Sequence, residues 1–115
     1  MFENELDKLN LKVDTTNMYM EEGFTDLKVA SIRRLTPIKA DGTPDPSRTP
    51  IFVGTTQLLT PEGPLPIQAP LMANSLQEAL EVFADAMKKA VADMMQEARR
   101  MKQDEASRII VPGRG

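Results

Sequence analysis

The chain has neither cysteine nor histidine among its 115 residues. It therefore has no disulfide, no thiol nucleophile, no zinc site of the usual Cys/His kind and no histidine-based acid–base catalysis. No Gly-rich phosphate loop, Gly-x-Ser-x-Gly elbow or catalytic Ser-x-x-Lys motif is present. The sequence indicates no cofactor and no metal, and it favours a protein that acts by binding over an enzyme that acts on a small molecule.

Aromatic residues and long apolar runs are also scarce. The chain has four Phe, one Tyr and no Trp, against eight Met. Because methionine adapts to varied neighbours, the methionines fit either an adaptable binding surface or, as their clustering in one helical run favours, a core. No stretch approaches the roughly 18 apolar residues of a membrane span, and the acidic N-terminus is unlike a secretory signal. We expect a cytoplasmic protein without membrane contact.

Charge is mixed along the chain, which has 14 basic and 17 acidic residues and a net charge of −3. Nucleic-acid binders concentrate their basic residues in one footprint. The candidate contacts for a polyanion are Arg99, Arg100 and Lys102, but neighbouring acidic residues weaken their field. Basic residues that complement a helix dipole explain the same pattern. Nucleic acid is therefore a disfavoured partner.

The most informative stretch is residues 75–105, which predicts one long amphipathic helix. Its start is marked by Ser75 and Glu78, which have the spacing of a capping box. Neither Gly nor Pro interrupts the run. Apolar residues recur every three or four positions and so share one face: Leu76, Leu80, Phe83, Met87, Ala90, Met94, Ala98 and Met101.

A helix of this length exceeds its own domain. At 1.5 Å per residue it spans roughly 46 Å, whereas a compact domain of this size has a radius of gyration of about 13 Å. Part of the apolar stripe is therefore expected to contact another subunit, and the alternative is a helix that lies wholly across its own sheet. The predicted interface residues are Leu80, Phe83, Met87, Val91, Met94, Ala98, Met101, Ile109 and Ile110. In either arrangement we expect Leu80, Phe83 and Met87 to be needed for folding.

The rest of the chain predicts a three-stranded antiparallel meander. The strands are residues 24–38, residues 51–60, which are rich in β-branched side chains, and the proline-rich residues 64–70, which suit an edge because proline cannot donate to a ladder. Residues 39–50 form a loop by composition, with no EF-hand pattern. A tight turn at residues 60–63 joins the last two strands.

These elements make a single α+β domain over residues 1–115. Residues 1–23 form an N-terminal arm or short helix, 24–70 the sheet, 75–105 the long helix, and 106–115 a tail. The tail either docks its apolar Ile109–Val111 segment as a strand, which we favour, or continues the helix. We expect a non-enzymatic homo-oligomer, a dimer or larger, that acts by protein binding or assembly. A holdase-like chaperone and a nucleic-acid-binding oligomer are the alternatives.

Overall fold

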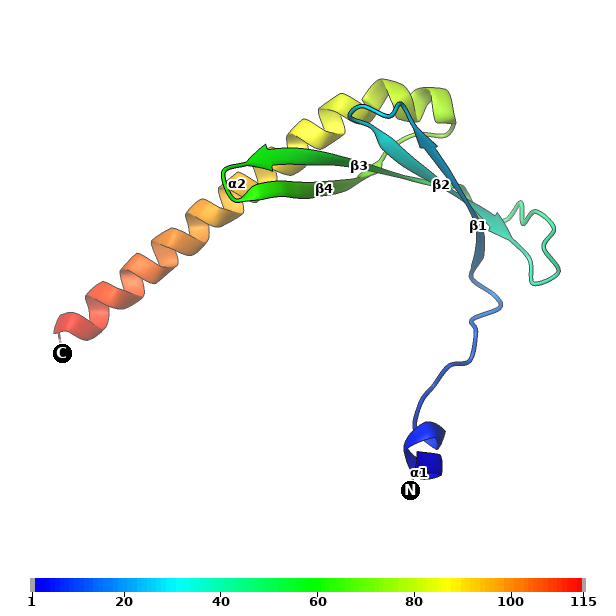
Figure 1. The fold of residues 1–115 in the computed structure, drawn as a ribbon, viewed down its shortest axis with the longest axis horizontal. Coiled ribbons are helices and arrows are strands. Elements are labelled where there is room, and N and C mark those ends of the chain that lie inside the picture. The colour runs from blue at the N-terminus through cyan, green and yellow to red at the C-terminus, as the bar shows by residue number, and fades with distance from the viewer. Residues whose placement is uncertain (1, 115) are drawn as a thin grey trace.

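The computed structural model describes residues 2–114, with side-chain surroundings for residues 4–104. Its elements, in chain order (Figure 1), are α1 (Phe2–Asp7), β1 (Met18–Thr25), β2 (Ser31–Ile38), β3 (Ile51–Thr60), β4 (Gly63–Leu71) and α2 (Leu76–Arg114). The strands form one antiparallel sheet in the order β1-β2-β3-β4. The α+β class, the long C-terminal helix and the short N-terminal helix are confirmed. The prediction of three strands is wrong, because the sheet has four.

The additional strand is β1, which begins at Met18 within the expected N-terminal arm and takes in the first two residues of the strand predicted over 24–38. Residues 26–30 of that predicted strand form a turn between β1 and β2, and the rest of it is β2. Asp26 closes the turn, since its Oδ1 accepts hydrogen bonds from three successive N–H groups at 2.8–3.0 Å. Leu27 adopts a left-handed conformation with φ of 60°. No Gly or Pro marks this turn. The sequence pattern therefore did not predict a turn at this position.

The hairpin of β3 and β4 follows the prediction closely. Thr60 pairs with Gly63 across a two-residue turn, and the Thr60 hydroxyl donates a 2.6 Å hydrogen bond to the Gly63 carbonyl. β4 lies at the edge of the sheet, where its three internal prolines leave the pairing with β3 intact. β1 forms the other edge.

The helix α2 begins where its capping residues predict. The Ser75 hydroxyl accepts a 3.2 Å hydrogen bond from the Glu78 N–H, and the Glu78 carboxylate accepts one of 2.9 Å from the Asn74 N–H. Its other end lies further along than expected, because the backbone stays helical to Arg114. The favoured docking of the Ile109–Val111 segment as a strand is thus replaced by the alternative of a continued helix. A helix of 39 residues is about 58 Å long.

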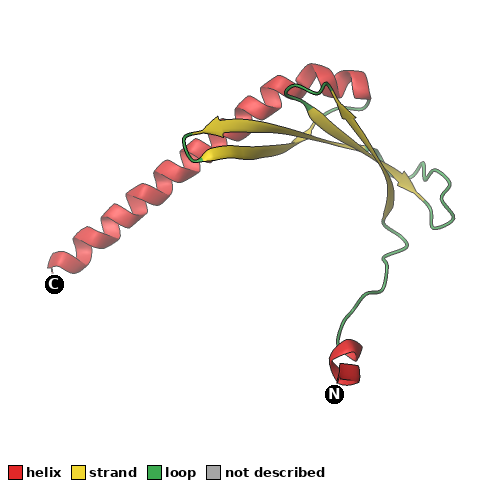
Figure 2. Ribbon diagram, in the orientation of Figure 1, coloured by secondary structure: helices red, strands yellow, loops and turns green. Residues whose placement is uncertain are grey.

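The inner part of α2 packs on one face of the sheet, across β3 and β4 (Figure 2). The helix comes close because Gly54 has no side chain: a Cβ there would lie 3.1 Å from Phe83, Met87 and Leu71 atoms. Burying these apolar side chains is the main stabilising term for the fold. The buried core consists of Ile32, Phe52, Ile67, Leu71, Ala79, Phe83 and Met87.

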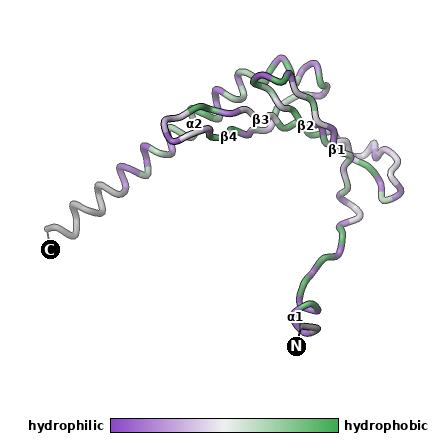
Figure 3. The backbone as a smooth tube through the Cα atoms, viewed as in Figure 1, coloured by the Kyte–Doolittle hydropathy of each residue, from purple (hydrophilic) through white to green (hydrophobic). Residues whose placement is uncertain are grey.

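The molecule is elongated. Its radius of gyration is 20.9 Å, whereas a compact chain of this length has a value of about 13 Å. Figure 1 shows two causes: α2 projects beyond the β3–β4 turn, and α1 lies away from the sheet at the end of an extended segment. Leu6 of α1 and, along this segment, Leu9, Leu11 and Val13 are exposed. Figure 3 shows hydrophobic and hydrophilic residues interspersed there.

Candidate interaction surface

The outer part of α2 presents an apolar face that the described part of the chain leaves uncovered. The buried stripe of Phe83 and Met87 continues through half-buried Val91 to Met94, Ala98 and Met101, at the same three and four spacing. Every residue from 92 to 104 is exposed, including Met94 at 41% and Met101 at 58%. The face that packs on the sheet therefore runs on past the sheet into solvent.

The predicted interface residues differ in their surroundings, and half-buried Val91 lies between the buried and the exposed members. Phe83 and Met87 are buried within their own chain. Met94, Ala98 and Met101 are exposed together on the outer helix, whereas Ile109 and Ile110 lie outside the residues whose side chains the structure describes. Leu80 is 56% exposed at the flank of the packing face, which is contrary to our expectation that it is needed for folding. Ala79 takes the fully buried position, since a small side chain lets the helix approach the sheet closely.

An apolar cleft of about 420 Å³ lies beside the exposed Leu80. The turn between β1 and β2 forms one wall, and the first turns of α2 form the other. The contacts of α2 with the sheet fall mainly on β3 and β4, so the cleft lies beside the helix and not beneath it. Sequence reasoning missed the cleft, because it depends on where the helix crosses the sheet. Its apolar lining includes Phe24, Val29, Ile32, Leu76, Leu80 and Phe83.

A larger groove, of about 660 Å³, follows the opposite flank of α2 along the edge strand β4. Small and medium apolar side chains line its floor, and the ion pair between Lys89 and Asp93, at 2.9 Å, lies at its margin. The two flanks of the inner helix are therefore both apolar and both open. The floor is formed by Ala69, Pro70, Met72, Val82, Ala86 and Ala90.

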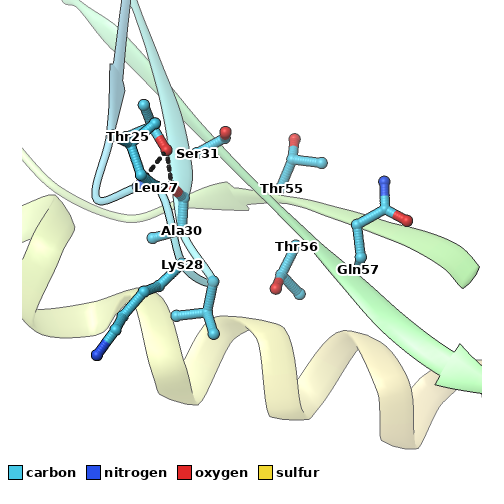
Figure 4. A pocket seen from close by; sticks show the side chains of 9 residues that line it. Thr25, Leu27, Lys28, Ala30, Ser31, Thr55, Thr56 and Gln57 are labelled. Atoms are coloured by element: carbon cyan, nitrogen blue, oxygen red, sulfur yellow. Dashed lines mark hydrogen bonds between the residues drawn. The ribbon is translucent and has the colours of Figure 1, made fainter.

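A smaller pocket of about 220 Å³ lies between the β1–β2 turn and β3 (Figure 4). The Thr25 hydroxyl donates to the Ala30 carbonyl at 2.8 Å and accepts from the Leu27 N–H at 3.0 Å, so this polar side chain serves the turn itself. Lys28 is the one ionisable residue of its lining. We assign no chemistry to this pocket, since its hydroxyl and amide groups lack a neighbouring acid–base pair.

Arg48 organises the polar side of the sheet. Its guanidinium donates hydrogen bonds to the carbonyls of Met18 and Ile38 at 3.0 and 2.9 Å and lies 4.9 Å from the Tyr19 ring centroid. Its Nε donates to Asp45 at 2.9 Å. Hydrogen bonds from Ser47 and Arg48 lower the pKa of Asp45 from 3.8 to about 2. This network fastens the loop of residues 39–50 to the start of β1 and has a structural role.

Two of the three predicted polyanion contacts, Arg99 and Arg100, have partners within the helix itself, and Lys102 is exposed. Arg100 pairs with Glu97 at 3.0 Å, and the Arg99 Nε donates to the Met95 carbonyl at 3.5 Å. Within the described residues, no group of three or more acidic side chains is arranged to hold a metal ion. In the same part of the chain, no helix has the length and apolarity needed to cross a membrane.

Comparison with protein-family models, with curated proteins and with solved structures finds no match to this chain.

Proposed function

We propose that this chain is a non-enzymatic homo-oligomeric protein that acts by binding and assembly, and that the outer part of α2 pairs with α2 of another copy. The observation that carries the proposal is the continuous apolar face from Val91 through Met94 and Ala98 to Met101. This spacing is that of a helix–helix seam. Fully burying one methionine side chain stabilises an association by about 1.5–3 kcal/mol.

The surface area of the chain supports the same conclusion. A compact monomer of 12.8 kDa exposes about 6,300 Å², whereas this chain exposes 9583 Å². The excess of about 3,300 Å² per chain is larger than the roughly 1,000–2,500 Å² that each subunit of an obligate homodimer buries. Among the described residues, 16 large hydrophobic side chains are exposed, against six large ones and Ala79 buried in the core. A single copy thus leaves much of its apolar surface in water.

The test is the solution mass, measured by light scattering on a size-exclusion column across a dilution series. Wild type should have a mass at least twice 12.8 kDa. The double variant Met94→Asp with Met101→Asp should dissociate while its circular dichroism stays that of a folded protein, because these side chains lie beyond the core. Ala92→Asp, on the opposite face of the same exposed helix, is the matched control and should keep the wild-type mass.

Two results would contradict the proposal. One is a wild-type protein that stays monomeric at all concentrations. The other is a double variant that keeps the wild-type mass. Unfolding of the double variant together with the control would show that the outer helix is needed within a single chain, which also argues against pairing between copies.

A further inference from the structure

The two edge strands of the sheet differ in the number of backbone N–H groups that are free to bond to a further strand. In an antiparallel strand, successive residues direct their N–H and C=O groups to opposite sides, so alternate residues bond to the neighbouring strand and the others face outward. On an edge strand the outward residues decide whether a further strand can be added. β4 and β1 are the two edges.

The outward groups of β4 are blocked. The two-residue turn joins Thr60 to Gly63, a hydrogen-bonded pair in such hairpins. The odd-numbered residues of β4 therefore bond to β3, and the even-numbered residues face outward. These are Pro64, Pro66, Gln68 and Pro70, of which three have no N–H to donate.

The outward groups of β1 are intact. The Asp26 N–H donates to the Ala30 carbonyl at 3.3 Å just beyond the strand ends, which places even-numbered β1 residues toward β2. On the other side of β2, Pro37 accepts from the Asp45 N–H at 3.1 Å, as the same alternation requires. The residues of β1 that face outward are Tyr19, Glu21, Gly23 and Thr25, and all four retain their N–H.

The two glutamates of β1 form ion pairs with arginines of the neighbouring strand β2. Charged side chains commonly protect an edge strand from pairing, and β1 carries Glu21 and Glu22. Each is bound by an arginine of β2: Arg33 lies 2.7 Å from Glu21 on one face, and Arg34 lies 2.8 Å from Glu22 on the other. These ion pairs draw both carboxylates toward β2 and offset part of their charge.

We infer that β1 pairs antiparallel with β1 of a second copy, which joins two four-stranded sheets into one of eight strands. This inference rests on the proposed function, namely that the chain self-associates, and it names a second contact. A second copy suits the edge because an antiparallel β1 pair is self-complementary about a two-fold axis. The excess exposed area leaves room for two contacts in each chain.

The charges also restrict the register. A two-fold axis that passes through one residue places that residue directly opposite its copy in the other chain. Like charges directly opposite each other destabilise a strand pair, so axes at Glu21 or Glu22 are disfavoured. Axes at Met20 or Gly23 place each glutamate opposite an uncharged residue. Figure 1 shows β1 and the outer end of α2 at opposite sides of the molecule. Strand pairing and helix pairing therefore use separate surfaces.

The experiment compares Gly23→Pro with Gly23→Ala by light scattering. Proline removes one outward N–H and no bond to β2, whereas a Cβ at Gly23 has no atom within 4 Å. Because each two-fold contact loses two hydrogen bonds, we expect Gly23→Pro to raise the dissociation constant of the strand contact at least about tenfold and to lower the mass. Gly23→Ala should keep the wild-type mass.

Single cysteines provide a readout that does not depend on the proline variant folding, since the chain has none of its own. Opposed residues of an antiparallel pair lie about 4.5–5.5 Å apart at Cα, within reach of a disulfide. Under oxidation, Met20→Cys or Gly23→Cys should form a disulfide-linked dimer, and Gln68→Cys on the blocked edge should not.

The outcomes separate this inference from the proposed function. If Gly23→Pro folds and keeps the wild-type mass, or if neither β1 cysteine links more than Gln68→Cys does, the strand contact is overturned. The helix contact would still stand if Met94→Asp with Met101→Asp dissociates the protein. A monomeric wild type overturns both.

Discussion

Gly54 of β3 lies directly beneath Phe83 of α2, so closely that a Cβ on Gly54 would be 3.1 Å from the Phe83 ring. Met87 and Leu71 lie at the same distance from that position, and the helix can approach β3 only because the glycine has no side chain. The core of this chain is small, and much of it meets at this point.

Enlarging Gly54 should therefore destabilise the fold. Overpacking a filled core costs typically 1–3 kcal/mol, so we expect Gly54→Ala to lower the free energy of unfolding by about 1 kcal/mol and Gly54→Val by about 2–3 kcal/mol. Urea denaturation measures both. Gly23→Ala, in open space on β1, is the matched control. Equal effects at the two glycines would show that Gly54 is not a close contact.

Leu80 and Phe83 should respond very differently to substitution by Asp. Leu80 is 56% exposed, whereas Phe83 is 8% exposed. Asp at position 80 loses helix propensity and partial packing, so we expect a cost of about 1 kcal/mol. Asp at position 83 buries an unpaired charge, which prevents folding of so small a core. Circular dichroism and urea denaturation distinguish them, and an unfolded Leu80→Asp variant would contradict the described packing.

The sequence pattern predicted what depends on local chemistry. Ser75 and Glu78 mark the start of α2. The turn formers between Thr60 and Gly63 mark the turn that joins β3, which is rich in β-branched residues, to β4, in which prolines recur at alternate positions. It did not separate β1 from β2, because the turn there depends on Asp26 bonding to three amides and on a leucine with positive φ. Neither is encoded in a turn residue such as Gly or Pro.

The candidate surface was predicted in part for the same reason. Helical periodicity places Met94, Ala98 and Met101 on one face. The length of the helix indicates that this face extends beyond the end of the sheet. Periodicity alone cannot give the crossing position of the helix, so it misplaced Leu80 and missed the cleft beside the β1–β2 turn. The sequence alone also could not show which β1 residues direct their N–H groups outward, because this follows from the pairing register of all four strands.

Leu27 offers a test of strain at that turn. Its φ of 60° costs a non-glycine residue about 1–2 kcal/mol, and its side chain is 89% exposed, so little packing is lost with it. We expect Leu27→Gly to raise the free energy of unfolding by about 0.5–1 kcal/mol, after the extra entropy of glycine in the unfolded chain. Val29→Gly, two residues along the same turn, should lower it. If both variants are destabilised alike, position 27 is not strained.

Asp45 should make the loop of residues 39–50 sensitive to acid. Hydrogen bonds from Ser47 and Arg48 lower its pKa in the folded state to about 2, from 3.8. A carboxylate whose pKa is lower in the folded than in the unfolded state contributes stability above the unfolded pKa, and this contribution disappears as the pH falls through the folded pKa. The loss should therefore fall between pH about 4 and about 2. The pKa values of Asp26 and Asp41 are lowered too, by backbone amides around Asp26 and by Thr43 beside Asp41, so they act in the same direction.

The variant Asp45→Asn isolates the contribution of this carboxylate. Urea denaturation at pH about 5 and at pH about 2 should show a smaller loss of stability in Asp45→Asn than in wild type, because the amide does not titrate in this range. Asp93→Asn, on the exposed surface of α2, is the control and should keep more of the wild-type pH dependence. Faster limited proteolysis of the loop in Asp45→Asn at neutral pH is also expected, because Arg48 loses its ion pair with Asp45 and keeps only its other hydrogen bonds. An unchanged pH dependence in Asp45→Asn would show that this carboxylate has no special role in fastening the loop.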